Sequence, residues 1–411
     1  MKLMNQPFTG QLGDRLIELL ESSEFHTLDI AVAFAKNSGV LRIKNSLQKF
    51  REAGGKVNVY VGVDLGGTSY EALTSLLMHT DSLNVVHCER GQTFHSKIYQ
   101  FSGKSNGLLV VGSHNLTGGG LWTNFESSIH IPTDGGNANG MAVHKELDDY
   151  FEELSSLKNS FMSITTQDEI DTLLINDYVI KEVADHVRQA KAAKQDGTWE
   201  RLFGNGVPAN LPRLTPSMNE NMPTVSGAPV NSTSREVGEA REEKQTIWFE
   251  TRKMTGGSRN ILDLSKTSLV EHGDPTGTPF DLGEKKFMRG AVEFFGLSPT
   301  ATDQTKNIIL NFEGVDYSNN TILYPVGENP NGTWRLQIKG VSSSNEKITE
   351  VFRGESESLH LVEKVITFTK IQDDYYFLSV FPEAELESFK IASSILARNG
   401  KVPSARFLGL L

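Results

Sequence analysis

Two basic side chains, His95 and Lys97, stand two residues apart in the apolar segment FHSKIYQF. If a strand carries this segment, alternation places both side chains on the same face of the sheet, where both can reach one anion. A second apolar run breaks into the loop GSHN, which contains Ser113 and Asn115, and polar loops at strand ends are common positions for sites. Glu126 follows on a third expected strand and can supply the carboxylate that a working histidine needs.

This combination fits chemistry at phosphorus. A neutral imidazole can form a covalent bond to phosphorus and so divide one difficult displacement into two steps. Lys97, Ser113 and Asn115 can bind the non-bridging oxygens. Glu126 can hold one ring nitrogen of His95, so that the other is unprotonated and correctly aimed. A general acid must protonate the departing oxygen, and a second histidine suits that role near neutral pH.

The HSK triplet, the GSHN loop and the glutamate together resemble the HxK…GSxN…E signature of the phospholipase D superfamily, in its nuclease branch. The chain is most similar to the metal-independent type II restriction endonucleases of the BfiI and NgoFVII kind. The resemblance implies an α/β N-terminal domain, with a mixed sheet flanked by helices. It also implies that His95 is the nucleophile, that Lys97 and Asn115 bind the phosphate, and that Glu126 orients the histidine.

The chain departs from the broader family pattern in two ways. Ser102 stands where HxKxxxxD would place an aspartate, which weakens an expectation of lipase activity more than one of nuclease activity. Among the ten histidines only His95 begins an HxK triplet, whereas the superfamily's site combines two. One chain therefore holds half a site, and we expect a two-fold homodimer through the N-terminal domain, with one His95 attacking and the other acting as acid.

Each motif alone has an ordinary interpretation. An HxK triplet is typical of an exposed strand edge, and a GSxN loop of a simple turn; their order and the following glutamate favour the catalytic interpretation. For His114 we expect a solvated loop position rather than a substrate contact, and for His87 and His130 satisfied structural positions. Asp64 either lines the site from the sheet edge or caps a turn.

The bulk composition is that of an ordinary globular protein of 411 residues. No apolar run approaches the roughly 20 residues of a membrane helix, and the N-terminus lacks the apolar core of a signal peptide, so we expect a cytoplasmic protein with no membrane partner. The single cysteine, Cys88, excludes an internal disulfide and a cysteine-based zinc site. We expect no cofactor and no metal. The net charge of −11 argues against broad attraction to nucleic acid but permits a local basic surface.

Three regions follow from the pattern of apolar residues. Residues 1–165 alternate strand-like and helix-like runs, which predicts a largely parallel sheet with helices on both faces; the strands of 94–126 should continue it. Residues 166–244 should form a helical extension and a linker rich in Pro, Ser and Gly. Residues 245–411 contain seven short strand-like runs, which predict a β barrel or sandwich, and a closing helix over 384–399.

The third region opens with TRKMTGGSRN, whose Arg and Asn side chains have the bidentate geometry used in base readout, although a solvated turn is the alternative. With FFGLSP and GTWRLQIKG, this segment resembles the C-terminal DNA-recognition domain of the same endonucleases, which is related to the plant B-three pseudobarrel. In that fold two arms straddle the major groove. The resemblance implies a mainly β pseudobarrel whose DNA-binding residues are Arg252, Lys253, Ser258, Arg259, Asn260 and Arg335.

The sequence therefore predicts a sequence-specific, metal-independent endonuclease that acts on double-stranded DNA through a phosphohistidine. Whether a helicase or methyltransferase partner of a restriction system accompanies the protein stays open. The alternatives are a non-catalytic DNA-binding component of a defence or restriction complex, against which the intact motif argues, and a phospholipid phosphodiesterase. The latter would need a membrane-facing surface and usually a second HxK motif.

Overall fold

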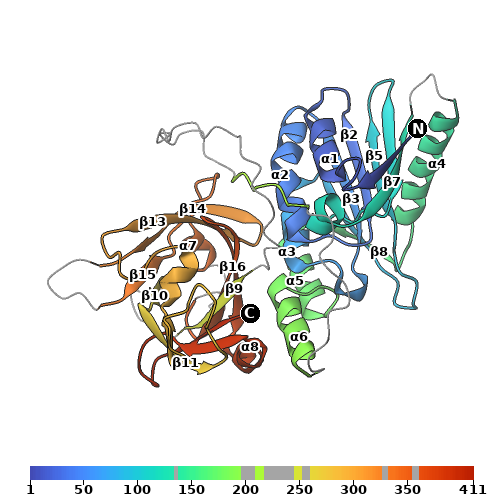
Figure 1. Cartoon of the computed structure of the whole chain (residues 1–411). Helices are drawn as coiled ribbons and strands as arrows, with labels where there is room; N and C mark the ends of the chain where they lie inside the picture. Colours follow the sequence, from blue (N-terminus) through green and yellow to red (C-terminus); the bar gives the residue numbers. More distant parts are fainter. Residues whose placement is uncertain (134–137, 196–208, 217–244, 252–259, 326–331, 354–360) are drawn as a thin grey trace. The chain divides into compact units, whose positions relative to one another are not determined.

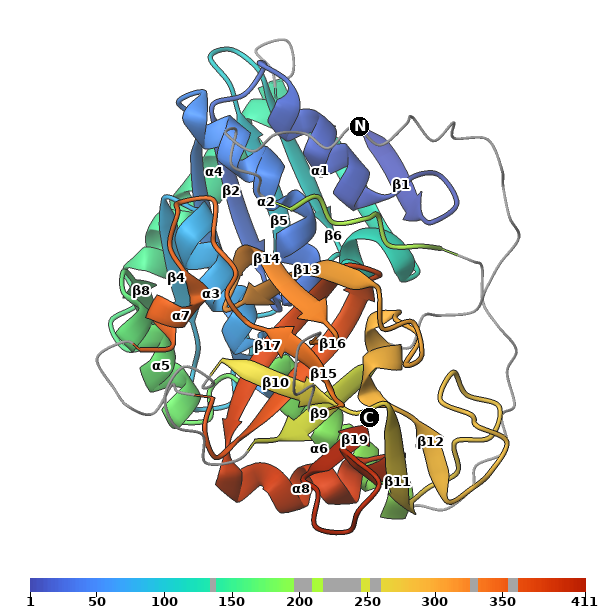
Figure 2. The ribbon, with the colours of Figure 1, turned by 90° about the vertical axis from the view of Figure 1, so that its left-hand side faces the viewer.

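The computed structural model of the chain describes residues 1–133, 138–195, 209–216, 245–251, 260–325, 332–353 and 361–411 (Figures 1 and 2). It divides into two compact units: Met1–Glu182 with Phe203–Thr215, and Val183–Leu202 with Pro216–Leu411. The boundaries of the three regions drawn from the sequence stay a prediction. None of the described helices has the length and apolar character needed to cross a membrane.

The first unit is built on an eight-stranded sheet in the order β1-β7-β6-β5-β2-β3-β4-β8. The strands are β1 Lys2–Gln6, β2 Thr27–Val32, β3 Lys56–Gly62, β4 Ser82–Val86, β5 Lys97–Ser102, β6 Gly107–Gly112, β7 Glu126–Pro132 and β8 Phe161–Ile164. Only β2, β3 and β4 run parallel to one another, and every other neighbouring pair is antiparallel.

The prediction of a largely parallel sheet was therefore wrong, whereas the mixed sheet is observed. The reason lies in the connections. A parallel pair needs a crossover of a dozen or more residues, which α2 and α3 provide between β2, β3 and β4, but the four residues between β5 and β6 allow only a hairpin. The three strands of the 94–126 region do continue the sheet, as expected.

Helices cover both faces of this sheet (Figure 1). The helices of this unit are α1 Leu12–Glu21, α2 Asn37–Glu52, α3 Tyr70–His79, α4 Ala138–Ser155 and α5 Gln167–Ile175, with short turns η1 Asp64–Gly66 and η2 Gly119–Thr123. Helix α6 Glu182–Gln195 belongs to the second unit from Val183 onward. Alternation along β2 assigns the faces: Ile30 and Val32 join the core under α1, α2 and α3, whereas Ala31 packs in the core under α4. In Figure 2, α1 and α2 lie over β2 and β5.

The second unit is mainly β, as expected. Its eleven strands form one sheet in the order β10-β15-β14-β13-β17-β16-β9-β19-β18-β11-β12, antiparallel except for the β13–β17 pair. The strands are β9 Thr246–Glu250, β10 Ile261–Leu264, β11 Thr267–His272, β12 Phe287–Arg289, β13 Thr305–Phe312, β14 Val315–Leu323, β15 Trp334–Gln337, β16 Lys364–Gln372, β17 Tyr375–Pro382, β18 Ile395–Arg398 and β19 Phe407–Leu410. The relation to the B-three pseudobarrel stays a prediction.

The helix expected over 384–399 is only half a helix. The turn η6 Glu383–Glu385 leads into α8 Leu386–Ala392, and the chain then becomes strand β18. Ser393 ends the helix by accepting a hydrogen bond from the buried Trp248 indole at 2.8 Å. Beyond it, β18 pairs with both β11 and β19, and two ladders of backbone hydrogen bonds override the helical propensity of the segment.

The loop after β6 is fixed against the start of α2. Its residue Leu116 accepts from Lys36 N–H and donates to the carbonyl of Phe34, each at 3.0 Å. Gly39, in the first turn of α2, faces this loop so closely that an added Cβ would lie 2.6 Å from the carbonyl oxygen of Leu116. Because the obstacle is backbone, α2 and the loop can be this close only with glycine at position 39.

We therefore predict that Gly39→Ala displaces the loop that carries Asn115 and destabilises the contact by about 1–3 kcal/mol, since overpacking forces the backbone to shift. Hydrogen exchange measured by mass spectrometry should show faster exchange in peptides covering 36–52 and 113–123. Gln48→Ala, at an exposed position of the same helix, is the matched control and should leave both peptides unchanged. Unchanged exchange in Gly39→Ala would contradict the prediction.

Candidate active site

His95 and Lys97 come together at the start of β5. The strand begins at Lys97, so His95 lies two residues ahead of it and not within it, contrary to the extended strand on which the sequence argument relied. His95 is exposed, whereas only 9% of Lys97 is accessible. The two groups nevertheless lie together, because the chain entering β5 is held in place from both sides.

Two hydrogen bonds fix the backbone around His95. The amide of Phe94 donates to Asp64 Oδ2 at 3.2 Å, and the carbonyl of Ser96 accepts from Ala33 N–H at 2.8 Å. Asp64, the first residue of η1, therefore fixes the backbone beside His95, and its lining of the site stays a prediction. The segment is positioned by β2 on one side and by η1 on the other.

The ammonium of Lys97 lies against the imidazole of His95. Its Nζ is 2.9 Å from Nδ1 and 3.1 Å from Nε2, and it donates to the carbonyl of His95 at 3.0 Å. An ammonium at this distance donates to an unprotonated ring nitrogen. The arrangement thus places an imidazole ring directly beside a cation, and which ring nitrogen accepts depends on the tautomer.

Asn115 is linked to the surroundings of His95 by Phe34. Its Oδ1 accepts from Phe34 N–H at 3.2 Å, and this leaves Nδ2 as the outward donor. The Phe34 ring lies edge-on to the imidazole of His95, with ring centroids 6.0 Å apart and planes at 83°. The end of β2, the start of β5 and the loop after β6 therefore bring an imidazole, an ammonium and a side-chain amide to one end of the sheet.

Glu126, the first residue of β7, is held by Ser113 and Asn124. The Ser113 hydroxyl donates to Oε2 of Glu126, and Asn124 Nδ2 donates to Oε1 at 3.2 Å. Ser113 is itself fixed, because its Oγ accepts from Ser127 N–H at 3.1 Å. Within this chain the described contacts of Glu126 are with these residues; its orienting of His95 and the phosphate binding by Ser113 stay predictions.

Two opposing effects act on the charge of Lys97. Burial lowers its pKa from the ordinary 10.5, because the ammonium is less well solvated than in water. The negative charge of Glu126 raises the pKa and so partly restores the cation. Glu126 is therefore close enough to Lys97 to influence the group expected to bind phosphate.

Three further histidines considered from the sequence, His87, His114 and His130, have hydrogen-bond partners within the fold. His114 was expected to be solvated, and this was wrong: it is 1% exposed, with Nδ1 2.8 Å from the carbonyl of Gly120 and Nε2 3.1 Å from Ser128 Oγ. The glycines that follow let the loop fold back over it. His130 is buried, as expected of a structural group, and burial lowers its pKa to about 4. His87 has a partner in Asp64, at 2.9 Å, also as expected.

Two positioning residues were missed from the sequence. Phe34 holds Asn115 and touches His95, but it lies 81 residues before Asn115 and about 60 before His95, so its role follows only from the pairing of β2 with β5. Asn124 stands two residues before Glu126, a spacing that could have marked it. Among the residues that the structure describes, no three His, Cys, Asp or Glu side chains gather as a metal site would require.

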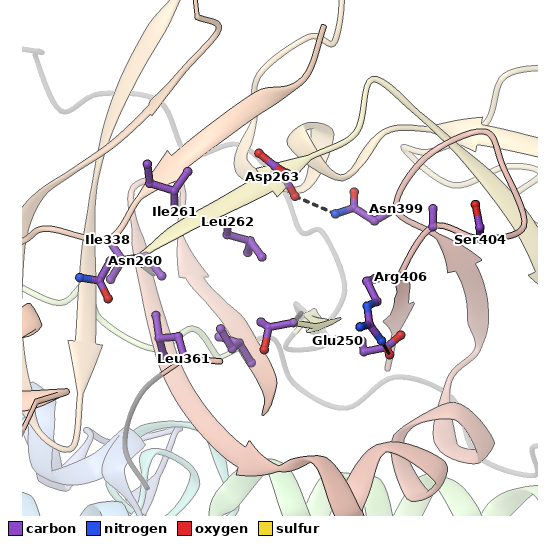
Figure 3. Close-up of a pocket in the computed structure, with 13 residues that line it drawn as sticks. Glu250, Asn260, Ile261, Leu262, Asp263, Ile338, Leu361, Asn399, Ser404 and Arg406 are labelled. Carbon is purple, nitrogen blue, oxygen red and sulfur yellow. Dashed lines mark hydrogen bonds and ion pairs between the residues drawn. The ribbon is translucent and has the colours of Figure 1, made fainter. Parts of the chain in front are cut away.

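Of the predicted DNA-binding residues, Arg252, Lys253, Ser258 and Arg259 lie outside the described residues. The other two lie at or beside a cavity of about 260 Å³ in the second unit (Figure 3). Asn260 lines it, and Arg335 is 4.0 Å from Asp263, another lining residue. The structure thus places both predicted residues around one hollow, without testing their role.

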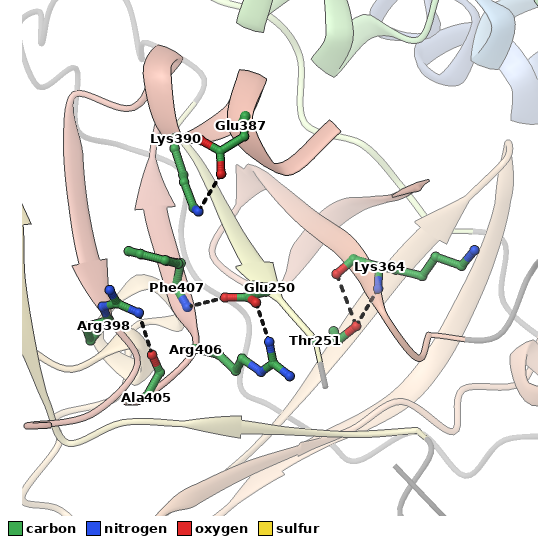
Figure 4. Close-up of polar contacts among 9 residues, drawn as sticks. All are labelled: Glu250, Thr251, Lys364, Glu387, Lys390, Arg398, Ala405, Arg406 and Phe407. Atoms are coloured by element: carbon green, nitrogen blue, oxygen red, sulfur yellow. Dashed lines mark hydrogen bonds and ion pairs between the residues drawn. The ribbon is translucent and has the colours of Figure 1, made fainter. Parts of the chain in front are cut away.

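The cavity has an apolar wall and a charged wall. Leu262, Ile338 and Leu361 form part of the first, and Glu250 with Arg406 part of the second (Figure 3). The Glu250 carboxylate accepts from Arg406 at 2.5 Å and from the amide of Phe407 at 2.9 Å (Figure 4). Because Glu250 is nearly buried, this pair and the amide are what make its charge tolerable there.

No family model and no curated protein matches the sequence. Among solved structures, the chain is similar to NucT from Helicobacter pylori (16% identity, 37% of this chain and 93% of that chain, TM-score 0.27). It is also similar to Nuc from Salmonella typhimurium, a phospholipase D family member (15% identity, 40% of this chain and 97% of that chain, TM-score 0.28). A third similar structure is phosphatidylserine synthase from Haemophilus influenzae (12% identity, 44% of this chain and 43% of that chain, TM-score 0.30). At such TM-scores these similarities decide neither family nor activity, which are argued from the residues.

The opposing effects on Lys97 predict how anion binding depends on pH. The dissociation constant of inorganic phosphate should rise as pH increases through the lowered pKa of Lys97, because the cation is lost. Glu126→Gln removes the charge that raises this pKa, so the rise should begin at a lower pH. Calorimetric titration between pH 8 and 11 measures it, with Glu24→Gln, at an exposed position, as control. An unchanged or upward-shifted profile in Glu126→Gln would contradict the assignment.

Proposed function

We propose that the protein is a metal-independent phosphodiesterase that cleaves DNA through a covalent bond to His95. The observation that carries this proposal is the contact between the exposed His95 imidazole and the Lys97 ammonium at one end of the sheet, where Phe34 links the Asn115 amide to His95. A nucleophile beside a cation and a neutral donor is the minimum set for attack on a phosphodiester. The similarity to NucT and Nuc is compatible with it.

In the first step, an unprotonated ring nitrogen of His95 attacks phosphorus. A nitrogen–phosphorus bond forms, the bond to one ester oxygen breaks, and that oxygen leaves as an alcohol after taking a proton from an acid. In the second step, water attacks phosphorus, gives up a proton and releases His95, and the product is a phosphate monoester. Lys97 and Asn115 neutralise and orient the non-bridging oxygens in both steps.

The acid is the part of the site that one chain lacks. Only His95 begins an HxK triplet, and His114, the other histidine of the two motifs, is buried among backbone and serine partners. We therefore assign the proton donor to His95 of a second copy, related by a two-fold axis through the N-terminal units. One composite centre then cuts one strand at a time.

Sequence specificity is assigned to the second unit. Among its residues, Arg252, Lys253, Ser258, Arg259, Asn260 and Arg335 have side chains suited to base readout, and double-stranded DNA is the proposed substrate. This makes the protein a restriction endonuclease, which operates with a helicase or methyltransferase where its system includes one. The overall charge of −11 requires that the DNA surface be local.

Cleavage of plasmid DNA in EDTA tests the chemistry. We expect wild-type cutting without divalent metal, a fall of about 1,000-fold or more in His95→Ala, and a protein–DNA adduct after alkaline quenching, in which phosphohistidine survives. His26→Ala, at another exposed histidine of the first unit, is the matched control and should cut normally. Cutting that needs magnesium, or normal cutting by His95→Ala, would refute the mechanism.

Mixing wild-type and His95→Ala chains tests the composite site. If each centre needs two copies of His95 and the chains assort freely, an equal mixture retains about a quarter of the wild-type activity, because only dimers with two wild-type chains act. A centre contained in one chain would retain about half. Activity measured over a series of mixing ratios, after exchange through a mild denaturant, separates a square from a linear dependence and so decides the point.

A further inference from the structure

Two phenylalanines form an exposed stack at the edge of the first unit. Phe8, in the turn after β1, and Phe125, directly before β7, have ring centroids 5.7 Å apart and planes at 26°. Their exposed fractions are 66% and 63%. Exposed single apolar residues are ordinary, but two large rings stacked on one another and left in water form a continuous apolar surface that the fold itself does not use.

The pair is held rigidly. The side chain of Gln6 is 1% exposed; its Nε2 donates to the carbonyls of Gly120 at 3.2 Å and Asn124 at 3.1 Å, and its Oε1 accepts from Leu12 N–H at 3.2 Å. These bonds tie the turn that carries Phe8 to the loop that carries Phe125. The rings are therefore pre-organised, and a ligand would not have to pay the entropy of ordering them.

The turn is also closed on itself. Thr9 N–H donates to the carbonyl of Asn5 at 2.9 Å, and Asn5 N–H donates to Thr9 Oγ1 at 2.8 Å. Asn5 in turn accepts from the Ser127 hydroxyl, on β7, at 2.9 Å. Phe8 is thus presented from a turn fixed to the same strand that begins at Glu126.

The pair lies within reach of the proposed phosphate site. Phe125 stands between Asn124 and Glu126, the two residues joined by a hydrogen bond at that site. β7 is two strands from β5 in the sheet, which is about 10 Å at the usual spacing of about 4.8 Å. Each strand of duplex DNA carries one phosphate per about 3.4 Å of helix axis, and successive phosphates along the strand itself are farther apart, so this distance corresponds to at most about three nucleotides from the bond attacked.

We propose that Phe8 and Phe125 form a stacking platform for a nucleobase of the strand being cut, a few nucleotides from the bond attacked by His95. The proposal rests on the proposed nuclease function and adds a substrate subsite to it. A base has the flat face and size to continue an existing aromatic stack, and such stacking tolerates any sequence because every base has a π-face. Recognition of this kind requires an unstacked or frayed base, which a single strand offers directly.

Steady-state kinetics on duplexes that the protein cuts tests the platform. With a duplex that the wild-type protein cleaves, frayed by mismatches within about three base pairs of the cut, Phe125→Ala and Phe8→Ala should each raise KM about tenfold and leave kcat near the wild-type value, in line with the usual worth of one base–aromatic stack. Phe125→Trp should restore KM. Ile175→Ala, at an exposed apolar position of the same unit, is the matched control and should not change KM. On the same duplex with abasic sites at the mismatched positions of the cut strand, all these variants should match the wild type.

A photochemical readout works without cleavage. Irradiation of the full-length His95→Ala protein with an oligonucleotide that contains 5-iododeoxyuridine should give an adduct on Phe8 or Phe125, located by mass spectrometry. Three results would each overturn the proposal: equal losses on the mismatched and the abasic duplex, adducts only at other residues, or a fall in molecular mass of Phe125→Ala, which would show that a second copy covers the rings. Normal cleavage by His95→Ala would instead refute the proposed function, and the adduct would still decide the platform.

Discussion

The contact between the Lys97 ammonium and the His95 imidazole is the interaction around which the first unit is arranged. A cation that is only 9% accessible loses much of its hydration, and it is tolerated because it finds acceptors in the ring and carbonyl of His95 and a negative charge in Glu126. The same ammonium is the group to which a phosphate would bind. The folded chain therefore keeps in place a partly desolvated cation whose attraction to an anion is stronger than it would be in water.

This contact depends on a backbone frame rather than on the two side chains alone. β2 holds the chain before β5 through Ala33 and Ser96, and the loop after β6 through Phe34 and Leu116. Both sets of bonds are made just beyond the end of β2, where the strand order places β5 beside β2 and β6 beside β5. A site at this edge is assembled by pairing between strands that are far apart in sequence. It is rigid because the hydrogen bonds that hold it are made by the backbone.

What the sequence could predict follows from how local each feature is. The predicted proximity of His95 and Lys97 is observed although the strand begins two residues later than expected. Two residues that are separated by only one other cannot lie far apart. The burial of His114 was missed because it depends on the path of the glycines after it, and the role of Phe34 because it depends on which strands pair. The prediction of a largely parallel sheet was wrong for strands joined by short connections, because such connections permit only hairpins. The short spacing between the two strands of 97–112 could have indicated this from the sequence.

Glu126 places a negative charge near the group that is expected to bind phosphate. Its contribution must therefore come from its effect on the neighbouring side chains. Direct repulsion would weaken phosphate binding, but Glu126 also raises the pKa of Lys97, which burial lowers. The serine and asparagine that hold its two oxygens spread the charge over hydrogen bonds away from Lys97. A carboxylate fixed in this way favours the protonated form of the buried ammonium, while its two oxygens are held by Ser113 and Asn124.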